Sequence, residues 1–281
     1  YGSHTETGVA SPATRWYLTE GATHSNFDLF YTLQNATDTD AQVQVTYLRP
    51  SPLAPVARTH TVVAHSRYNI WVDQEGTDLA STDVSAVIDV TNAVPIVVER
   101  SMYLTSGGQS FAAGHESAGV TAPATRWFLA EGATGSYFDL FVLVANPGTT
   151  TAQVRATYLL PDGTTHTKDY TVDPQSRFNI WVDLEEIPAG SGLHPLADTP
   201  VSTIVESLNS VPIIVERAMW WPGPTAATWT EAHNSPGATT TGTKWALAEG
   251  EFGGSRAIET YILVANTSST AGDVKVTLVF E

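Results

Sequence analysis

Cysteine is absent from this 281-residue sequence, and positively charged residues are scarce. Without cysteine the chain has no disulfide bond, no zinc–thiolate site and no cysteine nucleophile. Its 13 Lys and Arg residues face 29 Asp and Glu residues, which gives a net charge of −16, and Lys168, Lys244 and Lys275 are the only lysines. Nucleic acids and anionic membranes are bound by clustered Lys and Arg. The charge balance therefore excludes both as partners.

Long hydrophobic runs and the common catalytic motifs are also missing. The longest apolar stretches, such as Val94–Val98 and Val211–Val215, are far shorter than the roughly 20 residues of a membrane-spanning helix. The sequence contains no nucleophile elbow, no His-Glu-x-x-His motif and no glycine-rich phosphate loop. We therefore expect no membrane insertion, no cofactor, no metal site and no catalytic residues.

Hydrophobic residues are nevertheless abundant, at 42% of the chain, and include 8 Trp, 10 Tyr and 9 Phe. This is enough apolar surface to form buried cores and too much for a disordered chain. The low lysine content, the acidity and the many Thr, Ala, Val and Gly residues are typical of exported bacterial proteins. No signal peptide is seen and Tyr1 begins within a pattern, so we expect a piece of a longer, extracellular or cell-surface precursor.

Internal repetition is the strongest feature of the sequence. Pro12–Asn35 matches Pro123–Asn146 at 16 of 24 positions, and a more diverged copy begins at Lys244. The anchor tryptophans Trp16, Trp127 and Trp245 are separated by 111 and 118 residues. The spacing predicts a chain divided into 1–12, the tail of a preceding repeat; 13–122 and 123–241, two full repeats with their connectors; and 242–281, the first part of a third repeat.

The pattern inside each repeat predicts strands. Phe138–Ala145 alternates in character and ends at a turn signature, and further β-rich runs follow at 153–160, 164–172, 177–183, 201–208 and 212–219. No stretch has a convincing helical period over three turns. Six or seven short strands in about 110 residues predict an all-β fold built of tandem immunoglobulin-like β-sandwich repeats.

The recurring motifs are W-[YF]-L-x-E-G, F-D-L-F before a turn, S-R-[YF]-N-I-W-V-D and V-P-I-[VI]-V-E-R. Their combination resembles uncharacterised immunoglobulin-like tandem repeats of large secreted or cell-surface bacterial proteins. The resemblance covers nearly the whole chain. It implies an extracellular module without catalytic residues.

The S-R-[YF]-N-I-W-V-D strand supplies the candidate contact residues. A period of two places Phe178, Ile180 and Val182 on one face and the more polar set on the other. A Trp among such polar groups is suited to packing within its own repeat, to contact between repeats or subunits, or to glycan binding. The candidate residues are Arg67, Asn69, Trp71 and Asp73, with their counterparts Arg177, Asn179, Trp181 and Asp183.

Charged pairs inside otherwise apolar strands predict buried ion pairs. Glu99-Arg100 and Glu216-Arg217 each lie in such a strand, so at least one member of each pair should be partly buried and need a partner. We expect Arg15 or Arg126 to pair with Glu99 or Glu216, and Glu20, Glu131 and Glu249 to accept backbone or Arg donors. A glycosidase pair of carboxylates is the functional alternative, and its duplication in each repeat argues against it.

The joining segments Ala112–Thr125 and Thr230–Thr243 are expected to be ordered, because they hold the same spacing of His, Gly and Trp. The spacing recurs at His4, Gly8 and Trp16, at His115, Gly119 and Trp127, and at His233, Gly237 and Trp245. One His per repeat is weak evidence for a metal. Asn35 and Asn266 fit the short N-glycosylation motif.

These features predict a non-enzymatic, structural or adhesive repeat protein, which could be the subunit of a surface fibre and would bind copies of itself or neighbouring repeats. The alternative is a carbohydrate-binding region of a larger secreted enzyme, with surface polysaccharide as partner. Residues 243–281 correspond to only half a sandwich. We expect partners outside this chain to complete them, by continued polypeptide or by strands of a neighbouring copy.

Overall fold

A computed structural model describes residues 6–255 and 257–280, and within these ranges the protein is all-β, without an α-helix. The predicted fold class is thus confirmed at the level of an all-β, sandwich-like chain of several sheets. Tyr1, His4 and Glu281 lie outside the described residues. The described part also contains no helix long and apolar enough to cross a membrane. The chain forms two compact units, residues 1–241 and residues 242–281.

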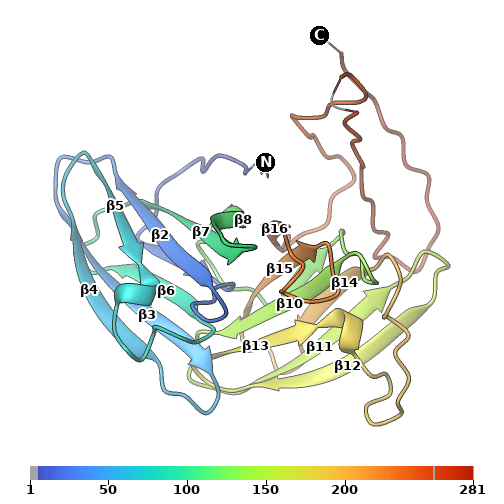
Figure 1. Cartoon of the computed structure of the whole chain (residues 1–281), viewed down its shortest axis with the longest axis horizontal. Coiled ribbons are helices and arrows are strands. Elements are labelled where there is room, and N and C mark those ends of the chain that lie inside the picture. Colours follow the sequence, from blue (N-terminus) through green and yellow to red (C-terminus); the bar gives the residue numbers. More distant parts are fainter. Residues whose placement is uncertain (1–5, 256, 281) are drawn as a thin grey trace. The chain divides into compact units, whose positions relative to one another are not determined.

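The first sequence repeat, residues 13–122, contains eight strands, one or two more than its pattern predicts (Figure 1). Strands β4, β3, β6 and β1 form one layer and β5, β2, β7 and β8 form the other. A 3-10 turn, η1 (Val72–Gln74), follows β5. The strands are β1 (Arg15–Leu18), β2 (Phe27–Asn35), β3 (Ala41–Pro50), β4 (Val56–Val62), β5 (Ser66–Trp71), β6 (Ser85–Val90), β7 (Val97–Ser106) and β8 (Gln109–Ala118).

The second sequence repeat, residues 123–241, has the same order of strands. One layer is β12-β11-β14-β9 and the other is β13-β10-β15-β16, which joins β3 of the first repeat through a short parallel pairing of β13. The 3-10 turn η2 (Val182–Leu184) follows β13. The strands are β9 (Arg126–Leu129), β10 (Asp139–Asn146), β11 (Ala152–Leu159), β12 (Thr165–Val172), β13 (Ser176–Trp181), β14 (Ser202–Ser207), β15 (Ile214–Trp221) and β16 (Glu231–Pro236).

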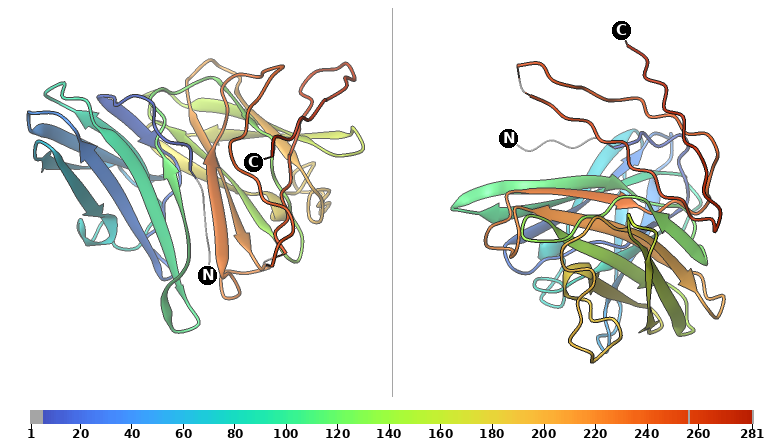
Figure 2. Two further views of the ribbon diagram at one scale, coloured as in Figure 1. Left: turned by 90° about the horizontal axis from the view of Figure 1, so that it is seen from above. Right: turned by 90° about the vertical axis from the view of Figure 1, so that its right-hand side faces the viewer.

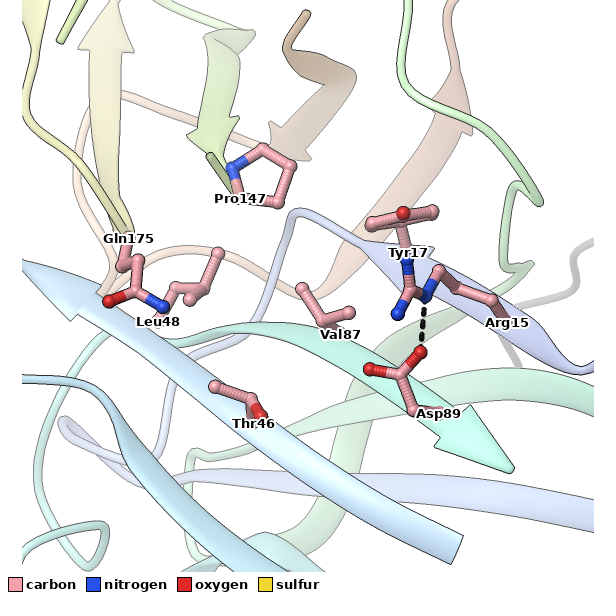
Figure 3. Close-up of a pocket in the computed structure, with 8 residues that line it drawn as sticks. All are labelled: Arg15, Tyr17, Thr46, Leu48, Val87, Asp89, Pro147 and Gln175. Atoms are coloured by element: carbon pink, nitrogen blue, oxygen red, sulfur yellow. Dashed lines mark hydrogen bonds and ion pairs between the residues drawn. The ribbon is translucent and has the colours of Figure 1, made fainter. Parts of the chain in front are cut away.

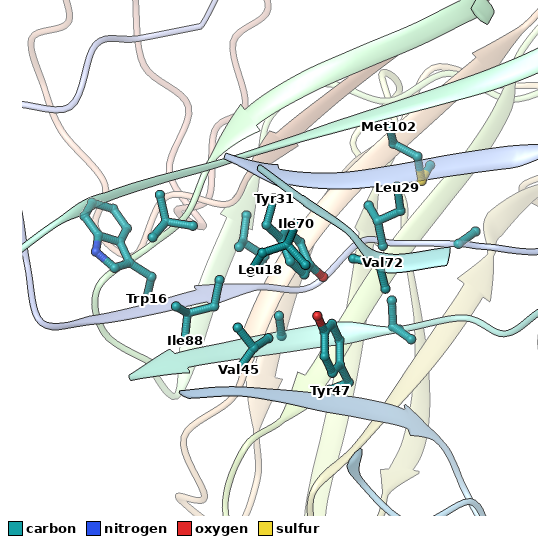
Figure 4. Packing of buried hydrophobic residues seen from close by; sticks show 14 of the residues in the cluster. Trp16, Leu18, Leu29, Tyr31, Val45, Tyr47, Ile70, Val72, Ile88 and Met102 are labelled. Atoms are coloured by element: carbon teal, nitrogen blue, oxygen red, sulfur yellow. The ribbon is translucent and has the colours of Figure 1, made fainter. Parts of the chain in front are cut away.

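The hydrophobic core of the first repeat lies between its two layers (Figure 4). Alternating residues of β2 and β3 point inward, which explains why Leu29, Tyr31, Leu33 and Val45 are all buried. Trp16 is the largest of these side chains, and its indole N–H donates to the Ile96 carbonyl at 3.0 Å. Trp127 repeats this in the second core, so the anchor tryptophans are core residues.

The joining segments are ordered, as their spacing predicts, because each ends a repeat as a strand. Strands β8 and β16 pair with β7 and β15. Gly119 lies against Trp16 and Gly237 against Trp127, so closely that a Cβ at either glycine would come within 3.2 Å and 3.1 Å of the indole. Each glycine therefore packs on the tryptophan of the repeat that it closes.

One turn recurs at the end of the F-D-L-F motif. Asn35 accepts a hydrogen bond from the amide of Thr37 and donates to the Thr39 carbonyl at 2.8 Å. Asn146 and Asn266 make the same turn. The side-chain nitrogen of Asn35, which a glycan would have to occupy, is buried and also donates to Val62. N-glycosylation of the folded repeat at Asn35 is incompatible with these bonds.

Residues 242–280, described by themselves and without Arg256, contain no assigned strand. Their large apolar side chains are exposed, including Trp245, Leu247, Phe252, Val279 and Phe280. An isolated bridge between Gly253 and Ile258 is the only sheet-like pairing among these described residues. The segment therefore does not cover its own apolar residues, and its completion from outside the chain stays a prediction.

Candidate functional site

A buried ion pair connects the two sequence repeats. Arg100 on β7 of the first repeat lies 2.6 Å from a carboxylate oxygen of Glu216 on β15 of the second repeat. Both side chains are excluded from water, at 0% and 1% exposure. Glu216 also accepts the amides of Thr19 at 2.7 Å and Glu20 at 3.2 Å. Because burial of a charge is costly unless it is paired and hydrogen-bonded, these contacts hold the repeats together.

Three further residues complete a junction cluster, defined as Glu20, Arg100, His115, Glu216 and Asn234. Asn234 on β16 accepts from Arg100 and donates to Glu20, both at 2.6 Å. His115 on β8 lies 3.1 Å from the same carboxylate. Strands β8 and β16 pack against each other, and Figure 2 shows them as adjacent green and orange strands. The cluster therefore joins residues of both repeats in one network.

The charge of Glu20 is set by this network. Burial raises the pKa of its carboxyl group, but His115, Arg100 and Arg177 together hold that pKa below its ordinary value of 4.5. Glu20 thus stays ionised in the folded protein although it is buried. Its stabilising contribution depends on the positive charges that surround it.

A second contact between the repeats is made by Arg177, one of the candidate residues of the S-R-[YF]-N-I-W-V-D strand. Its guanidinium donates to the carbonyls of Gly21 at 2.5 Å and Val84 at 3.1 Å. Asn179 donates to Asp83 at 3.3 Å. Arg177 is buried, so this side of β13 is covered by the first repeat.

Aromatic side chains of the second repeat pack beside this contact. The ring of Trp220 lies 5.1 Å from that of Phe27 in the first repeat, and Trp229 stacks on Trp220 at 5.2 Å. Both tryptophans are buried, and the first repeat's core cluster includes them. Polar and apolar contacts therefore form one continuous interface between the repeats.

The counterpart residues in the first repeat are placed differently. Arg67, Asn69 and Trp71 are exposed on β5, and Trp71 lies against Phe30 of its own repeat at 5.3 Å. Trp181 is half-buried against Phe141 at 5.0 Å. For both tryptophans, packing within their own repeat is therefore observed.

Asp73 and Asp183 do not belong to the outer face on which the two-residue period places them. Asp73 accepts the amide of Leu29 at 3.0 Å. Asp183 accepts those of Gly135 and Leu140, at 3.0 Å and 2.9 Å. The strand ends at Trp71 or Trp181, and the following 3-10 turn directs the carboxylate inward. Burial raises the pKa of Asp183 to about 6.

The expected ion pairs of Arg15 and Arg126 are wrong. Arg15 pairs with Asp89, and Arg126 with Glu206 at 3.1 Å, because β1 and β9 place these residues directly opposite each other across antiparallel pairs. Glu216 pairs with Arg100 instead. Glu99, the counterpart of Glu216, is half-buried on the surface of the first repeat, where burial and the nearby carboxylate of Glu116 raise its pKa against the opposing effect of Arg67.

The expectation that the charged strand pairs contain buried members is confirmed, since Arg100, Glu216 and Arg217 are all buried. Arg217 pairs with Glu131 of its own repeat at 2.5 Å. The sequence pattern does not indicate that Asn234 accepts from Arg100 or that His115 lies beside Glu20. The recurrence of Glu20 and Glu131 was a usable signal, but the sequence could not show that Glu216 enters a different repeat.

A shallow pocket of about 170 Å³ lies beside the interface (Figure 3). The Arg15–Asp89 pair forms one side, and Pro147 and Gln175 of the second repeat form the other. Its lining contains one carboxylate and no histidine or serine. Glu20 and Glu216, which both lie beside Arg100, are buried and do not line this pocket.

No family model and no curated protein matches the chain. Among solved structures, the crystal structure of Thermotoga maritima 1070 is similar at 20% identity and a TM-score of 0.34, covering 43% of this chain and 98% of that one. The Anabaena sensory rhodopsin transducer is similar at 23% identity and a TM-score of 0.29, covering 35% of this chain and 98% of that one. We therefore infer function from the residues of the chain itself.

Acid should weaken the junction cluster through Glu20. The folded pKa of Glu20 lies below 4.5, so its stabilisation is fully present above that pH and is lost as the pH falls through the lowered pKa. We expect the difference in free energy of unfolding between the wild type and Glu20→Gln to be constant above about pH 5 and to shrink below about pH 4. Urea denaturation from pH 3 to 7 measures it. A difference that stays constant to pH 3 would contradict this assignment.

Proposed function

We propose that the chain is part of a non-enzymatic structural or adhesive protein at the bacterial surface, built of tandem immunoglobulin-like β-sandwich repeats. The observation that carries the proposal is the burial of Glu216 of the second repeat beside Arg100 of the first repeat. Two domains joined only by a linker move freely relative to each other. A buried ion pair shared by two repeats restricts this motion, because separating the two charges from each other is strongly destabilising. A junction with a shared buried ion pair therefore suits a protein whose neighbouring repeats keep a fixed relative orientation.

The arrangement of ionisable groups supports a role without catalysis. Arg100 pairs with both Glu20 and Glu216, and all three side chains are almost fully buried. A catalytic acid or nucleophile needs access to a substrate. Motif resemblance and acidic composition support the surface location, and repeat-to-repeat contact supports neighbouring repeats as partners.

The rigidity of the junction can be measured with spin labels. Because the chain has no cysteine, labels attach only to cysteines that are introduced by substitution. Thr59→Cys on β4 and Thr167→Cys on β12 place spin labels at exposed positions, one in each repeat. We expect double electron–electron resonance to give one narrow distance distribution. Adding Glu216→Ala should broaden it, because the buried pair is lost, whereas Glu99→Ala should leave it narrow. A broad distribution in the doubly labelled wild-type background would overturn the proposal.

The carbohydrate-binding alternative is favoured by an exposed aromatic face, in which Trp71 and Phe111 are exposed and Phe30 and Tyr103 are half-buried. These rings contact one another, with Phe30 lying 5.3 Å from Trp71 and Tyr103 lying 4.9 Å from Phe111. Exposed aromatic rings are suitable platforms for sugars. The face therefore calls for a direct test of glycan binding.

We expect the wild type and Trp71→Ala to give the same background signal on a glycan array, because Trp71 packs against Phe30 of its own repeat. Trp181→Ala is the matched control, since Trp181 is half-buried at the corresponding position. Polysaccharide binding by the wild type that Trp71→Ala abolishes would establish the alternative function instead.

A further inference from the structure

The hydrophobic core of the first repeat contains side chains that the second repeat supplies. Trp220 on β15 and Trp229, which precedes β16, belong to the same cluster of buried residues as Phe27 of the first repeat. They are 2% and 6% exposed. The second repeat also contributes Leu143, Ala218 and Ala232 to this cluster. The sequence repeat at 13–122 therefore does not contain its whole core.

The second core likewise includes residues of the first repeat. Tyr17 on β1 and Leu48 on β3 belong to the buried cluster of the second repeat, at 7% and 1% exposure. Their neighbours Trp16, Leu18 and Tyr47 belong to the core of the first repeat. Because successive side chains of a strand point to opposite faces, β1 and β3 contribute one face to each core. The two cores thus share their strands.

Backbone groups of the first repeat also have their hydrogen-bond partners in the second repeat. Glu216 accepts the amides of Thr19 and Glu20, and Arg177 donates to the carbonyls of Gly21 and Val84. The parallel pairing of β13 with β3 continues the sheet from one repeat into the other. Polar contacts therefore connect the same segments as the shared cores.

The shared cores determine the cost of unfolding one repeat alone. If the second repeat unfolds, Phe27, at 8% exposure, loses the ring of Trp220 that lies 5.1 Å away. Tyr17 and Leu48 lose their apolar surroundings at the same time. Exposure of apolar surface to water is unfavourable in proportion to its area. A state with one folded and one unfolded repeat therefore lacks the stabilisation of the whole interface.

We propose that the two repeats fold and unfold as one cooperative unit, although the anchor tryptophans recur after 111 residues. This inference goes beyond the fixed orientation of the repeats, since docked domains can keep one orientation and still unfold separately. It means that neither repeat opens while its neighbour stays folded. A protease that cleaves unfolded chain would then meet an open repeat only in the rare state in which both are open.

Hydrogen exchange of the full chain tests this with two matched substitutions. Ile70 and Ile180 occupy the same position in the two repeats, each 1% exposed in the core of its own repeat. We expect Ile70→Val to speed exchange of the slowest amides of β2 and β3 by about two- to tenfold. The slowest amides of β10 and β11 should speed up by the same factor. Ile180→Val should give the reciprocal result.

Two further variants set the upper and lower limits of the effect. Trp16→Ala should speed exchange of the slowest amides in both repeats by about a hundredfold or more, because it removes a larger buried side chain. Trp71→Ala removes an exposed ring of the first repeat and should change the slowest amides of neither repeat by more than about fivefold. The conservative Ile→Val variants keep the test valid if Trp16→Ala does not fold.

The proposal is overturned if Ile70→Val speeds exchange only in the first repeat, or Ile180→Val only in the second, since separate units lose stability separately. The spin-label distances distinguish this failure from failure of the proposed function. A narrow distance distribution together with exchange that changes in one repeat alone rejects only the cooperative unit. A broad distribution rejects the fixed junction and the cooperative unit with it.

Discussion

Glu216→Ala is expected to lower the free energy of unfolding of the wild-type chain by about 3–5 kcal/mol, the usual cost of removing one member of a buried ion pair. The substitution leaves Arg100 buried at 0% exposure without its nearest carboxylate, which lies 2.6 Å away in the wild type. It also removes the acceptor of the Thr19 and Glu20 amides. A buried charge left with only the more distant carboxylate of Glu20, at 3.6 Å, and two unmade hydrogen bonds add to the same loss. Guanidinium denaturation followed by tryptophan fluorescence measures it.

Glu99→Ala provides the matched control because the same residue type occupies the same strand position without a covering repeat. We expect a change within about 0.5 kcal/mol, as for most surface substitutions. Amide hydrogen exchange adds a local readout: Thr19 and Glu20 should lose protection in Glu216→Ala and keep it in Glu99→Ala. Equal destabilisation by the two substitutions would show that Glu216 has no special role at the junction.

Trp16→Ala is expected to have the other large effect, also a loss of about 3–5 kcal/mol, because truncation of a fully buried aromatic side chain leaves a large cavity. Trp16 is 1% exposed, and its indole N–H donates to Ile96 at 3.0 Å and Ala13 at 3.2 Å. The void would remove contacts with Gly119, which packs on the ring. Chemical denaturation again gives the magnitude.

Two matched variants define what this result means. Trp127 occupies the same place in the second repeat, at 1% exposure and with a 2.9 Å bond to Ile213, so Trp127→Ala should cost about as much as Trp16→Ala. Trp71→Ala removes an exposed ring and should cost less than about 1 kcal/mol. A loss for Trp71→Ala as large as that for Trp16→Ala would contradict the assignment of Trp16 as the structural anchor.

Much of the strand pattern was predictable because a strand's side chains alternate over only two residues. Runs at 153–160, 164–172 and 201–208 correspond closely to β11, β12 and β14. The spacing predicts that the connectors are ordered, but it does not predict that they form strands. Each connector adds one strand, β8 or β16, and each full repeat therefore has eight strands. Short segments rich in Ala, Gly, Ser and His have little strand propensity of their own. Strands β8 and β16 form because β7 and β15 offer them a free edge to pair with.

Pairing partners were the least predictable part of the site. The charge of Arg15 indicates a need for an acid but not which one, and only the register that sets Arg15 opposite Asp89 decides it. Asp183 was assigned to the wrong face because the alternation stops where η2 begins, one residue before it. Both errors arise because hydrogen-bond register and turn position depend on the neighbouring strand, which the local pattern does not contain.

The sequence by itself determined the repeat, the all-β class and the burial of a charged residue in each V-E-R strand, because composition and short-range period are local properties of the chain. Only the tertiary structure decided that Glu216 pairs across to Arg100 of the first repeat while its counterpart Glu99 remains at the surface. Nearly identical strands have these different environments because burial depends on what lies against a strand. The second repeat lies against the first, and no repeat among the described residues lies against the face that contains Glu99.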